Sequence, residues 1–384
     1  MDGLRIEVAE AIAAIDPAEW ATLERGRSFY QSYPWLAWAE GSCGAEVRYL
    51  LAYNRAGALV GALPAYLLSG ADTTWNSWYD PLTVLAGDPA GARRRHSAWF
   101  PVLLLGGASG YHSDVLVDAT LDEAHRRLVI DELLRGGHRL AGACGARSTA
   151  MMYAPEKTAV TVADLRPDAS TTVLTSAGTR VAAHWNDFDD YLASFPKRRR
   201  QNLQREVNLF GATGHHIVQA KLSDCLEYVG PLLGNVHRRH GAADTDEVTT
   251  HYLAPQVPHL DPVSTVFLEL DDDGPVGFSL CMEWGRDLVV RVVGFDYARS
   301  ARFAYFTLAF YRPLEYAIRR GLGGVQLGPG TYQAKVARGA TLNTTWSVVW
   351  PPDDHEATWF ASAQRPGQDA QEAAPWLPGY LFAG

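Results

Sequence analysis

The most unusual local feature of the chain is a cluster of positive charges at the predicted start of a helix. Residues 197–205 read KRRRQNLQR and follow Pro196, which suits the first turn of a helix. The helix dipole disfavours cations at this end by about 0.3–1 kcal/mol each. A bound anion such as a phosphate would offset that cost through the side chains and the free N–H groups. The alternative is a solvated basic face, balanced by Asp187, Asp189 and Asp190 just upstream.

A glycine-rich segment with two cations lies near the end of the chain. Residues 326–339 read QLGPGTYQAKVARG and carry Lys335 and Arg338. The segment lacks the G-K-[ST] ending of a P-loop, and its glycine spacing differs from that of a dinucleotide-binding fingerprint. It follows Gly324–Leu327, which is short and apolar and predicts a buried strand. We therefore expect a loop that carries a cation into a cleft, with a surface turn as the alternative.

Nucleophilic and metal chemistry have little support in the sequence. There is no G-x-S-x-G elbow and no known Cys–His motif. The four cysteines, at positions 43, 144, 225 and 281, are far apart and indicate neither a disulfide framework nor a metal site. A reaction that needs only positioning, a general base and charge stabilisation fits these residue types better.

The elements that must position these residues are strands mixed with helices. The predicted strands are Val47–Tyr53, Ala58–Leu68, Ala146–Tyr153, Ser264–Leu270, Pro275–Trp284, Asp287–Asp296, Gly324–Leu327 and Trp346–Trp350. The predicted helices are Asp122–Arg135, Phe188–Ser194, Pro196–Phe210, Asp224–His240 and Ala304–Arg320. The pattern predicts an α/β protein of the α+β type.

A weak internal repeat indicates two related domains. A strand, a turn and a second strand containing Val-Gly occur at Val60-Gly61 and again at Val276-Gly277, and the same offset relates Asp80 to Asp296. The composition shifts to Pro, Asp, Ser and Thr around residues 165–176. We therefore expect domains at 1–168 and 169–350, followed by a tail at 351–384 that is rich in Pro, Asp, Ala and Gln.

Charge and hydropathy restrict the function classes. The chain has 34 Lys and Arg against 43 Asp and Glu, a net charge of −9, which disfavours a protein that coats nucleic acid with general positive charge. No apolar run reaches the roughly 18 residues of a membrane span, and the first residues lack a basic signal-peptide region. We therefore expect a cytoplasmic protein that does not bind membranes.

The charged segments resemble those of FemABX-like proteins, which are tandem GNAT-type N-acyltransferases. Residues 192–206, LASFPKRRRQNLQRE, followed by Gly214 before a strand, resemble the entry to the second domain of that group. Residues 316–322 (YAIRRGL), the glycine-rich segment 327–339 and residues 345–350 (TWSVVW) resemble its ending. The resemblance covers Thr171–Trp350 well and the N-terminal half weakly.

The resemblance implies both a fold and a reaction. Each GNAT-like domain would be a mixed, mostly antiparallel sheet flanked by helices. Members transfer an acyl group to an amine, from acyl-CoA in classical GNAT enzymes and from aminoacyl-tRNA in FemABX-like enzymes. The link Asp296–Ala304, DYARSARFA, has no glycine where acyl-CoA enzymes cradle pyrophosphate. This departure disfavours CoA and favours a tRNA or carrier-protein donor, although Arg299 and Arg302 remain possible phosphate ligands.

These considerations assign roles to named residues. We expect Asp296 and Tyr297 to help deprotonate the amine, and Lys335 to stabilise charge on the carbonyl oxygen or the leaving group. The expected ligands of the donor phosphates are Lys197, Arg198, Arg200, Arg205 and Arg338. The expected acceptor-binding residues are the polar and aromatic set Trp78, Tyr79, Asp80, Tyr111 and His112.

The predicted function is therefore N-acyl transfer that forms an amide. The favoured donor is aminoacyl-tRNA, and the acceptor is a small-molecule or peptide amine, with secondary metabolism as one setting. Acyl-CoA or acyl carrier protein is the alternative co-substrate, and we expect no permanently bound cofactor. Two other classes stay open, namely a GNAT-like binding protein without activity and an RNA-binding module, which the charge of −9 disfavours.

Overall fold

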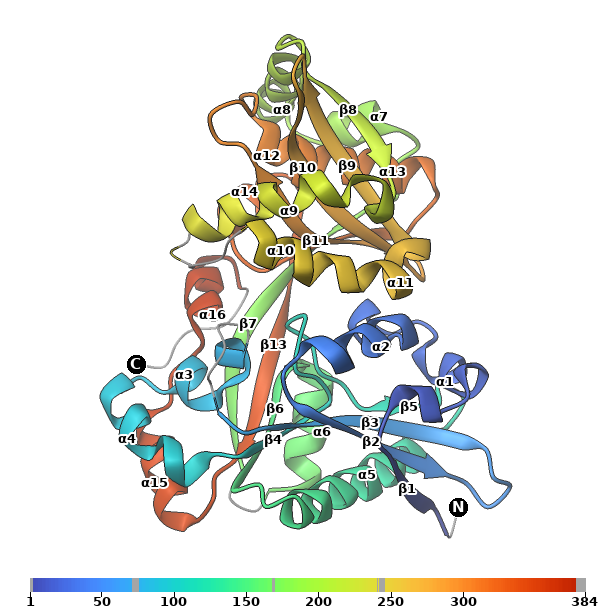
Figure 1. Ribbon diagram of the computed structural model, residues 1–384, viewed down its shortest axis with the longest axis vertical. Coiled ribbons are helices and arrows are strands. Elements are labelled where there is room, and N and C mark those ends of the chain that lie inside the picture. Colours follow the sequence, from blue (N-terminus) through green and yellow to red (C-terminus); the bar gives the residue numbers. More distant parts are fainter. Residues whose placement is uncertain (1–2, 71–75, 168–169, 240, 242–245, 378–384) are drawn as a thin grey trace. The chain divides into compact units, whose positions relative to one another are not determined.

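The chain forms two compact units joined by two strands. The computed structural model describes residues 3–70, 76–167, 170–239, 241 and 246–377. Unit 1 comprises residues 1–177 and 343–384, and unit 2 comprises residues 178–342. The chain leaves unit 1 in strand β7 (Thr171–Ala182) and returns in strand β13 (Thr341–Trp350), as Figure 1 shows.

The units differ from the domains expected from the sequence. The expected boundary between residues 168 and 169 lies outside the described residues, and Thr171, just after it, begins β7, whose Thr and Val residues favour a strand. The described part of the expected tail is folded. It forms α15 (Asp354–Ala363) and α16 (Gln368–Ala373) within unit 1, where Phe360 is completely buried.

The tail is attached to unit 1 by polar as well as apolar contacts. The indole Nε1 of Trp99 donates a 2.8 Å hydrogen bond to Glu356, and the rings of Trp99 and Phe360 lie 5.1 Å apart. Arg95 adds an ion pair to Glu356 at 3.3 Å. Residues that looked like a polar tail are therefore part of the unit 1 fold.

The sheet of unit 1 is mostly antiparallel. Its strands follow the order β1 (Arg5–Ala9), β2 (Glu46–Tyr53), β3 (Leu59–Leu68), β4 (Val102–Leu105), β6 (Ser148–Pro155) and β13. Among the described pairings of these strands, β4 and β6 alone are parallel, with Val102 opposite Ser148. The short strand β5 (Leu116–Val117) pairs with β3, and helix α5 (Glu123–Ala143) packs on β2 and β3.

The sheet of unit 2 is also mostly antiparallel. Its strands follow the order β7, β12 (Gly324–Gly328), β11 (Asp287–Phe295), β10 (Gly274–Trp284), β9 (Ser264–Asp271) and β8 (His216–Ala220). In the described part of this unit, β11 and β12 are the one parallel pair. Helix α9 (Leu222–Arg239) packs on β10 and β11, and helix α13 (Arg312–Arg319) packs on β12. A π-helical segment, Thr307–Tyr311, precedes α13.

Two glycines of unit 2 permit helices to approach both faces of its sheet. A Cβ at Gly294 would lie 2.6 Å from the backbone of Leu232 in α9. A Cβ at Gly277, on the neighbouring strand, would lie 3.0 Å from Leu308 in the π-helical segment. Gly61 in unit 1 likewise permits close packing of a helix, since a Cβ there would lie 2.4 Å from Val129 of α5. The Val-Gly pairs thus mark places where a helix packs closely on a hairpin.

The internal repeat is visible in the connections. In each unit an antiparallel hairpin is followed by a third antiparallel strand, a helix and a strand parallel to the third. The expected fold class, tandem mixed sheets flanked by helices, is confirmed. The match between Asp80 and Asp296 is wrong, because Asp80 caps helix α3 (Pro81–Leu85) before β4 whereas Asp296 follows β11.

The remaining helices connect these strands. They are α1 (Pro17–Glu24), α2 (Tyr33–Ser42), α4 (Pro89–Trp99), α6 (Glu156–Leu165), α7 (Phe188–Ala193), α8 (Lys197–Gly211), α10 (Asp246–Leu253), α11 (Val257–Leu260), α12 (Ala304–Phe306) and α14 (Tyr332–Val336). In the part of the chain that the structure describes, no helix combines the length and apolar character needed to span a bilayer.

Candidate functional site

In both units, strained backbone lies at the ends of the parallel strand pair. Among the described residues, the non-glycine residues with positive φ are Tyr111, Tyr153, Phe303 and Thr331, at φ 54°, 57°, 68° and 52°. In unit 1, Tyr111 follows β4 and Tyr153 lies near the end of β6. In unit 2, Phe303 follows β11 and Thr331 follows β12. Such strain costs about 1–3 kcal/mol per residue and gathers at functional sites. Ligands commonly bind at the carboxyl ends of parallel strands, so both places are candidate sites.

The parallel strands of unit 2 separate along their length. The pairing of β11 with β12 runs from Asp287 opposite Gly324 to Val289 opposite Gln326. A β-bulge at Arg291 follows. Leu280 of β10 pairs with Val292, whereas the next residue, Cys281, pairs with Val290, so Arg291 has no partner on β10. The pairing of β11 with β10 nevertheless continues to Phe295. The strand therefore turns away from β12 just before the loop that carries Asp296 and Tyr297.

Asp296 and Tyr297 begin that loop. The Asp296 N–H donates to Val276 at 2.8 Å, and its Oδ1 accepts from the Ala298 N–H at 3.0 Å. The Tyr297 ring is 45% exposed and lies 4.3 Å below the guanidinium of Arg239. The structure thus places both residues at the end of β11, where the sequence predicted them, and their role in proton transfer stays a proposal.

A buried carboxylate supports the other end of the loop. Glu269 on β9 is 0% exposed, and its Oε1 accepts from the Ala301 N–H at 2.9 Å. The same oxygen contacts Nδ1 of His215 at 2.8 Å, while Oε2 is buried without a hydrogen-bond partner among the described residues. Burial raises the pKa of Glu269, and the hydrogen bonds from Ala301 and His215 oppose this shift.

The raised pKa of Glu269 predicts a pH dependence of stability. An acid whose pKa is raised on folding binds its proton more tightly in the folded state, so folding is weakened as the pH rises from about 4.5 through the raised value. Glu269→Gln should remove this component and flatten the profile, as measured by urea unfolding from about pH 4 to 7. Asp272→Asn, in the exposed β9–β10 turn, is the control and should leave the profile unchanged. Parallel profiles for Glu269→Gln and wild type would contradict the assignment.

Lys335 has a different place from the one expected. It lies in α14, after β12, and is only 7% exposed. Its ammonium donates to the backbone carbonyls of three successive residues, Leu327 at 2.8 Å, Gly328 at 3.1 Å and Pro329 at 2.9 Å. A lysine has three hydrogens to donate, so these bonds use its full capacity. The geometry favours a structural role, in which the ammonium closes the turn after β12, and the expected role at a reacting oxygen stays a prediction.

Arg338 does not fit its expected role in phosphate binding. Its side chain is 6% exposed, and its Nη2 pairs with Glu206 at 2.5 Å. Nε donates to the Tyr311 hydroxyl at 2.9 Å and Nη1 to the Ala334 carbonyl at 2.8 Å. The guanidinium also lies 3.6 Å from the centre of the Phe306 ring. The group is therefore committed to the interior of unit 2.

The other four expected phosphate ligands lie on α8 and are exposed. Lys197, Arg198, Arg200 and Arg205 form no hydrogen bond or ion pair through their side chains with any residue that the structure describes. The upstream acids do not neutralise them. Asp187 caps α7 by accepting from the Asp190 N–H, and Asp190 accepts from Asn186. The alternative interpretation, a solvated basic face whose charge the upstream acids balance, is therefore less well supported.

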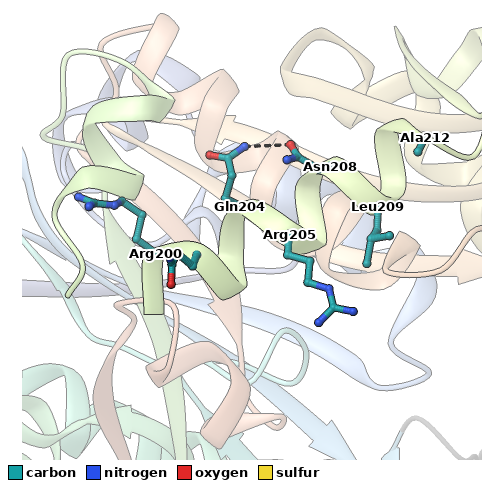
Figure 2. A pocket seen from close by; sticks show the side chains of 7 residues that line it. Arg200, Gln204, Arg205, Asn208, Leu209 and Ala212 are labelled. Atoms are coloured by element: carbon teal, nitrogen blue, oxygen red, sulfur yellow. Dashed lines mark hydrogen bonds between the residues drawn. The ribbon is translucent and has the colours of Figure 1, made fainter. Parts of the chain in front are cut away.

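A shallow pocket of about 590 Å³ follows the outer side of α8. Figure 2 shows Arg200 and Arg205 among the side chains that line it, together with Gln204 and Asn208, which share a 3.0 Å hydrogen bond. The sequence drew attention to the cations only. The polar residues one helical turn apart were missed, although their i, i+4 spacing places them on one side of a helix.

In unit 1 the structure brings four of the five expected acceptor residues together. The Trp78 and Tyr111 rings lie 6.0 Å apart, and the His112 N–H donates to the Tyr79 hydroxyl at 3.2 Å. Tyr153, which sequence analysis missed, joins them, with ring distances of 5.1 Å to Tyr79 and 5.4 Å to Tyr111. We call these five residues, Trp78, Tyr79, Tyr111, His112 and Tyr153, the aromatic cluster.

Asp80 does not belong to the aromatic cluster. It is 2% exposed, and its two carboxylate oxygens accept from the Leu82 N–H at 2.8 Å and the Thr83 hydroxyl at 2.6 Å. These bonds satisfy donors at the start of α3, which is the ordinary task of an N-cap aspartate. Its expected contact with the acceptor is corrected for this reason.

His112 gives the aromatic cluster a polar group without a partner. Its Nε2 is buried and has no hydrogen-bond partner among the described residues. Burial lowers the pKa of the imidazole, which therefore stays neutral at neutral pH. A neutral imidazole nitrogen can accept a hydrogen bond or a proton. Trp78, at the other side of the cluster, is 47% exposed.

Solved structures share this architecture at low sequence identity. FemX matches with a TM-score of 0.60 and 12% identity, covering 90% of this chain and 97% of the other. A tandem GNAT protein from the clavulanic acid biosynthesis pathway matches at 0.52 and 14%, covering 90% and 98%. The C-terminal domain of a putative lysylphosphatidylglycerol synthetase from Agrobacterium fabrum matches at 0.54 and 11%, covering 94% and 96%. At these identities the likeness shows the fold alone.

The family follows from a separate comparison of the sequence. None of the curated proteins matches the chain. The FemAB-like family model, described as peptidoglycan biosynthesis/recognition, matches residues 11–361, which is nearly the whole chain. The protein therefore belongs to the FemAB-like family of GNAT-fold proteins and is an enzyme that transfers acyl or aminoacyl groups.

Proposed function

We propose that this enzyme transfers an aminoacyl group from aminoacyl-tRNA to the amine of a small-molecule or peptide acceptor. The amine nitrogen attacks the ester carbonyl, the bond from that carbon to the ribose oxygen breaks, and an amide forms. The amine loses a proton and the ribose oxygen gains one, so the reaction is balanced without a further reagent. The observation that carries the proposal is the exposed, unpaired set of cations on α8.

The chemistry of α8 suits an extended polyanion. Lys197, Arg198, Arg200 and Arg205 present four charges within nine residues of one helix, and no carboxylate neutralises them in the described part of the chain. Phosphates spaced along a nucleic-acid backbone release counterions when they meet such a set, which favours binding. This local patch is compatible with the overall charge of −9, because only the contacting surface has to be basic.

The loop after β11 supports tRNA over CoA as the donor. A pyrophosphate is usually held by free backbone N–H groups, often in a glycine-rich loop. Here the N–H groups of residues 298 and 301 donate to the carboxylates of Asp296 and Glu269. Those of residues 299 and 300 donate to the Asp296 carbonyl at 3.2 and 2.8 Å. Four successive donors are thus already used within the protein.

The proposed acceptor site is the aromatic cluster of unit 1. Aromatic faces attract an ammonium group, and such contacts contribute about 0.5–2 kcal/mol. The unpartnered Nε2 of His112 offers an acceptor for one of the hydrogens of the amine. Strained backbone at Tyr111 and Tyr153 supports a functional role, because a purely structural cluster would not require it.

Trp78→Ala should raise the KM for the acceptor about 5- to 20-fold with little change in kcat, because it removes an aromatic face from the ammonium. Stability should stay within about 0.5 kcal/mol, since the side chain is half exposed. Steady-state kinetics at saturating donor measure the effect. Tyr228→Ala, a similarly exposed aromatic residue of unit 2, is the matched control. An unchanged acceptor KM in Trp78→Ala would remove the cluster from acceptor binding.

Donor screening tests the proposed function directly. The enzyme is incubated with a panel of amines and, separately, with aminoacyl-tRNA, acyl-CoA or acyl carrier protein, and amide products are detected by mass spectrometry. We expect product with aminoacyl-tRNA only. Product with acyl-CoA or acyl carrier protein only would overturn the donor assignment while leaving amide formation intact.

A further inference from the structure

We infer that a second pocket of unit 2, next to the basic face of α8, binds the base of a nucleotide whose phosphate lies beside Arg205. We call it the base pocket. It has a volume of about 550 Å³, within the range of about 300–1,000 Å³ that is typical of small-ligand sites. The inference rests on the proposed phosphate-binding role of α8 and specifies what is attached to that phosphate.

The walls of the base pocket are mainly aromatic and apolar. Phe188 of α7, Val207 and Phe210 of α8, and Tyr311 of the π-helical segment contribute to them. The rings of Phe188 and Tyr311 lie 5.9 Å apart in an edge-to-face arrangement at 78°. Tyr311 and Phe210 are buried, at 3% and 4% exposed, and back the pocket, so the half-buried Phe188 offers the ring face on which a nucleobase can stack.

One wall is rigidly held. The Tyr311 hydroxyl donates to Glu206 at 2.5 Å and accepts from Nε of Arg338 at 2.9 Å. These bonds fix the ring before any ligand arrives, so binding does not have to order it. The π-helical turn that carries Tyr311 is itself a feature often found at functional sites. This gives the buried Arg338 a positioning role in place of the direct phosphate contact that it lacks.

The base pocket adjoins the shallow pocket on α8. Both are lined by Asn208 and Ala212, so a single ligand can extend from one to the other. The hydrogen bond from Gln204 to Oδ1 of Asn208 fixes the orientation of the Asn208 amide. The Nδ2 group of Asn208 then remains as a donor on the shared wall, and asparagine amides commonly recognise base edges.

Charge divides the two pockets in the way that a nucleotide requires. Arg200 and Arg205 in the shallow pocket have no ion-pair partner in the described ranges. Arg312 in the base pocket pairs with Glu315 at 2.6 Å, so its charge is balanced. An anionic group is therefore favoured beside α8 and a neutral planar group in the base pocket. A nucleotide combines these two parts, whether it belongs to an RNA strand or to a free nucleotide.

The test compares ligands that differ only in the base. Isothermal titration of the full-length protein with adenosine monophosphate and with ribose 5-phosphate should show about 10-fold tighter binding of the nucleotide, as expected for one stacked base. Phe188→Leu should reduce this ratio to about 2-fold or less and leave the affinity for ribose 5-phosphate unchanged. Arg200→Gln with Arg205→Gln should weaken both ligands equally. Circular dichroism confirms that each variant is folded.

Two further arms identify the source of the nucleotide. A single-stranded hexaribonucleotide that binds at least 10-fold more tightly than the mononucleotide indicates RNA, and equal affinities indicate a free nucleotide. Equal binding of adenosine monophosphate and ribose 5-phosphate to wild type would overturn the inference, as would tighter binding of an acidic hexapeptide than of the oligonucleotide. None of these titrations requires acyl transfer, so failure of the donor screen and failure of the base pocket are separate results.

Discussion

Replacing Lys335 with methionine should lower the free energy of unfolding by about 3–5 kcal/mol. The ammonium donates to the carbonyls of Leu327, Gly328 and Pro329, and the side chain is almost completely buried. Methionine keeps the length and the apolar contacts of the lysine stem but leaves the carbonyls of Leu327 and Pro329 without this donor, while the Gly328 carbonyl still accepts from the Thr179 hydroxyl at 2.6 Å. Each hydrogen bond to a charged group contributes about 1.5–3 kcal/mol, although the losses at one site are not additive. Urea unfolding monitored by circular dichroism measures the change.

Two controls separate this structural role from a catalytic one. Lys157→Met, at a lysine whose side chain is 80% exposed, should change stability by less than about 0.5 kcal/mol. Turnover of the Lys335→Met protein that remains folded should be near that of wild type. A stable Lys335→Met protein whose kcat falls by about 10²–10³-fold would instead place the ammonium at the reacting oxygen, as the sequence had indicated.

The hairpins of both units were predictable because local sequence determines them. In the β9–β10 turn an Asp-Gly pair follows an apolar strand, and Asp271 itself accepts from the Asp273 N–H at 2.9 Å. In the β2–β3 turn Asn54 accepts from the N–H groups of residues 56 and 58. The strands that these turns connect alternate or are wholly apolar, which a short window of sequence reveals.

The division into units was not predictable in the same way. Strand β7 follows β6 in sequence, with α6 between them, yet it pairs with β12. Strand β13 follows β12 in sequence, with α14 between them, yet it pairs with β6. A boundary placed where the composition changes cannot detect such an exchange, because pairing between distant segments leaves little trace in either segment alone. The polar composition after Pro351 was misleading for the same reason, since Glu356 is polar but bonds to buried Trp99.

The candidate site shows what residue types can and cannot reveal. The basic run of α8 and the aromatic residues near position 78 were found from composition and spacing, and the structure leaves the first exposed and gathers the second. Lys335 and Arg338 looked equally suited to a cleft. Whether a cation reaches a cleft or a neighbouring carbonyl depends on the path of the backbone after β12, where Thr331 has a φ of 52°. Threonine seldom adopts the left-handed conformation, so nothing in the sequence indicates that the backbone turns in this way at Thr331.

Neutralising the basic face of α8 should have the largest effect on donor binding. In a variant with Lys197, Arg198, Arg200 and Arg205 all replaced by glutamine, the affinity for aminoacyl-tRNA should fall about 100-fold at low salt. Each phosphate contact contributes about 0.7–0.9 to the slope of log K against log salt concentration, so loss of four contacts should reduce the slope by about 3. Filter binding from about 50 to 200 mM salt measures both quantities. Glutamine keeps the helix, because its helix propensity is close to that of lysine and arginine.

A charge-matched control makes the result specific to α8. Arg25, Arg93, Arg139 and Arg147 of unit 1 are exposed, and their side chains form no ion pair in the portion of the chain that is described, so their replacement by glutamine changes the net charge equally. If tRNA is attracted by the general field of the protein, both variants should lose the same slope, and α8 would have no special role. If the phosphates contact α8 directly, the control should keep nearly the full slope and affinity. Because the whole chain carries a charge of −9, binding depends on where the positive charges are concentrated, and this pair of variants tests that location.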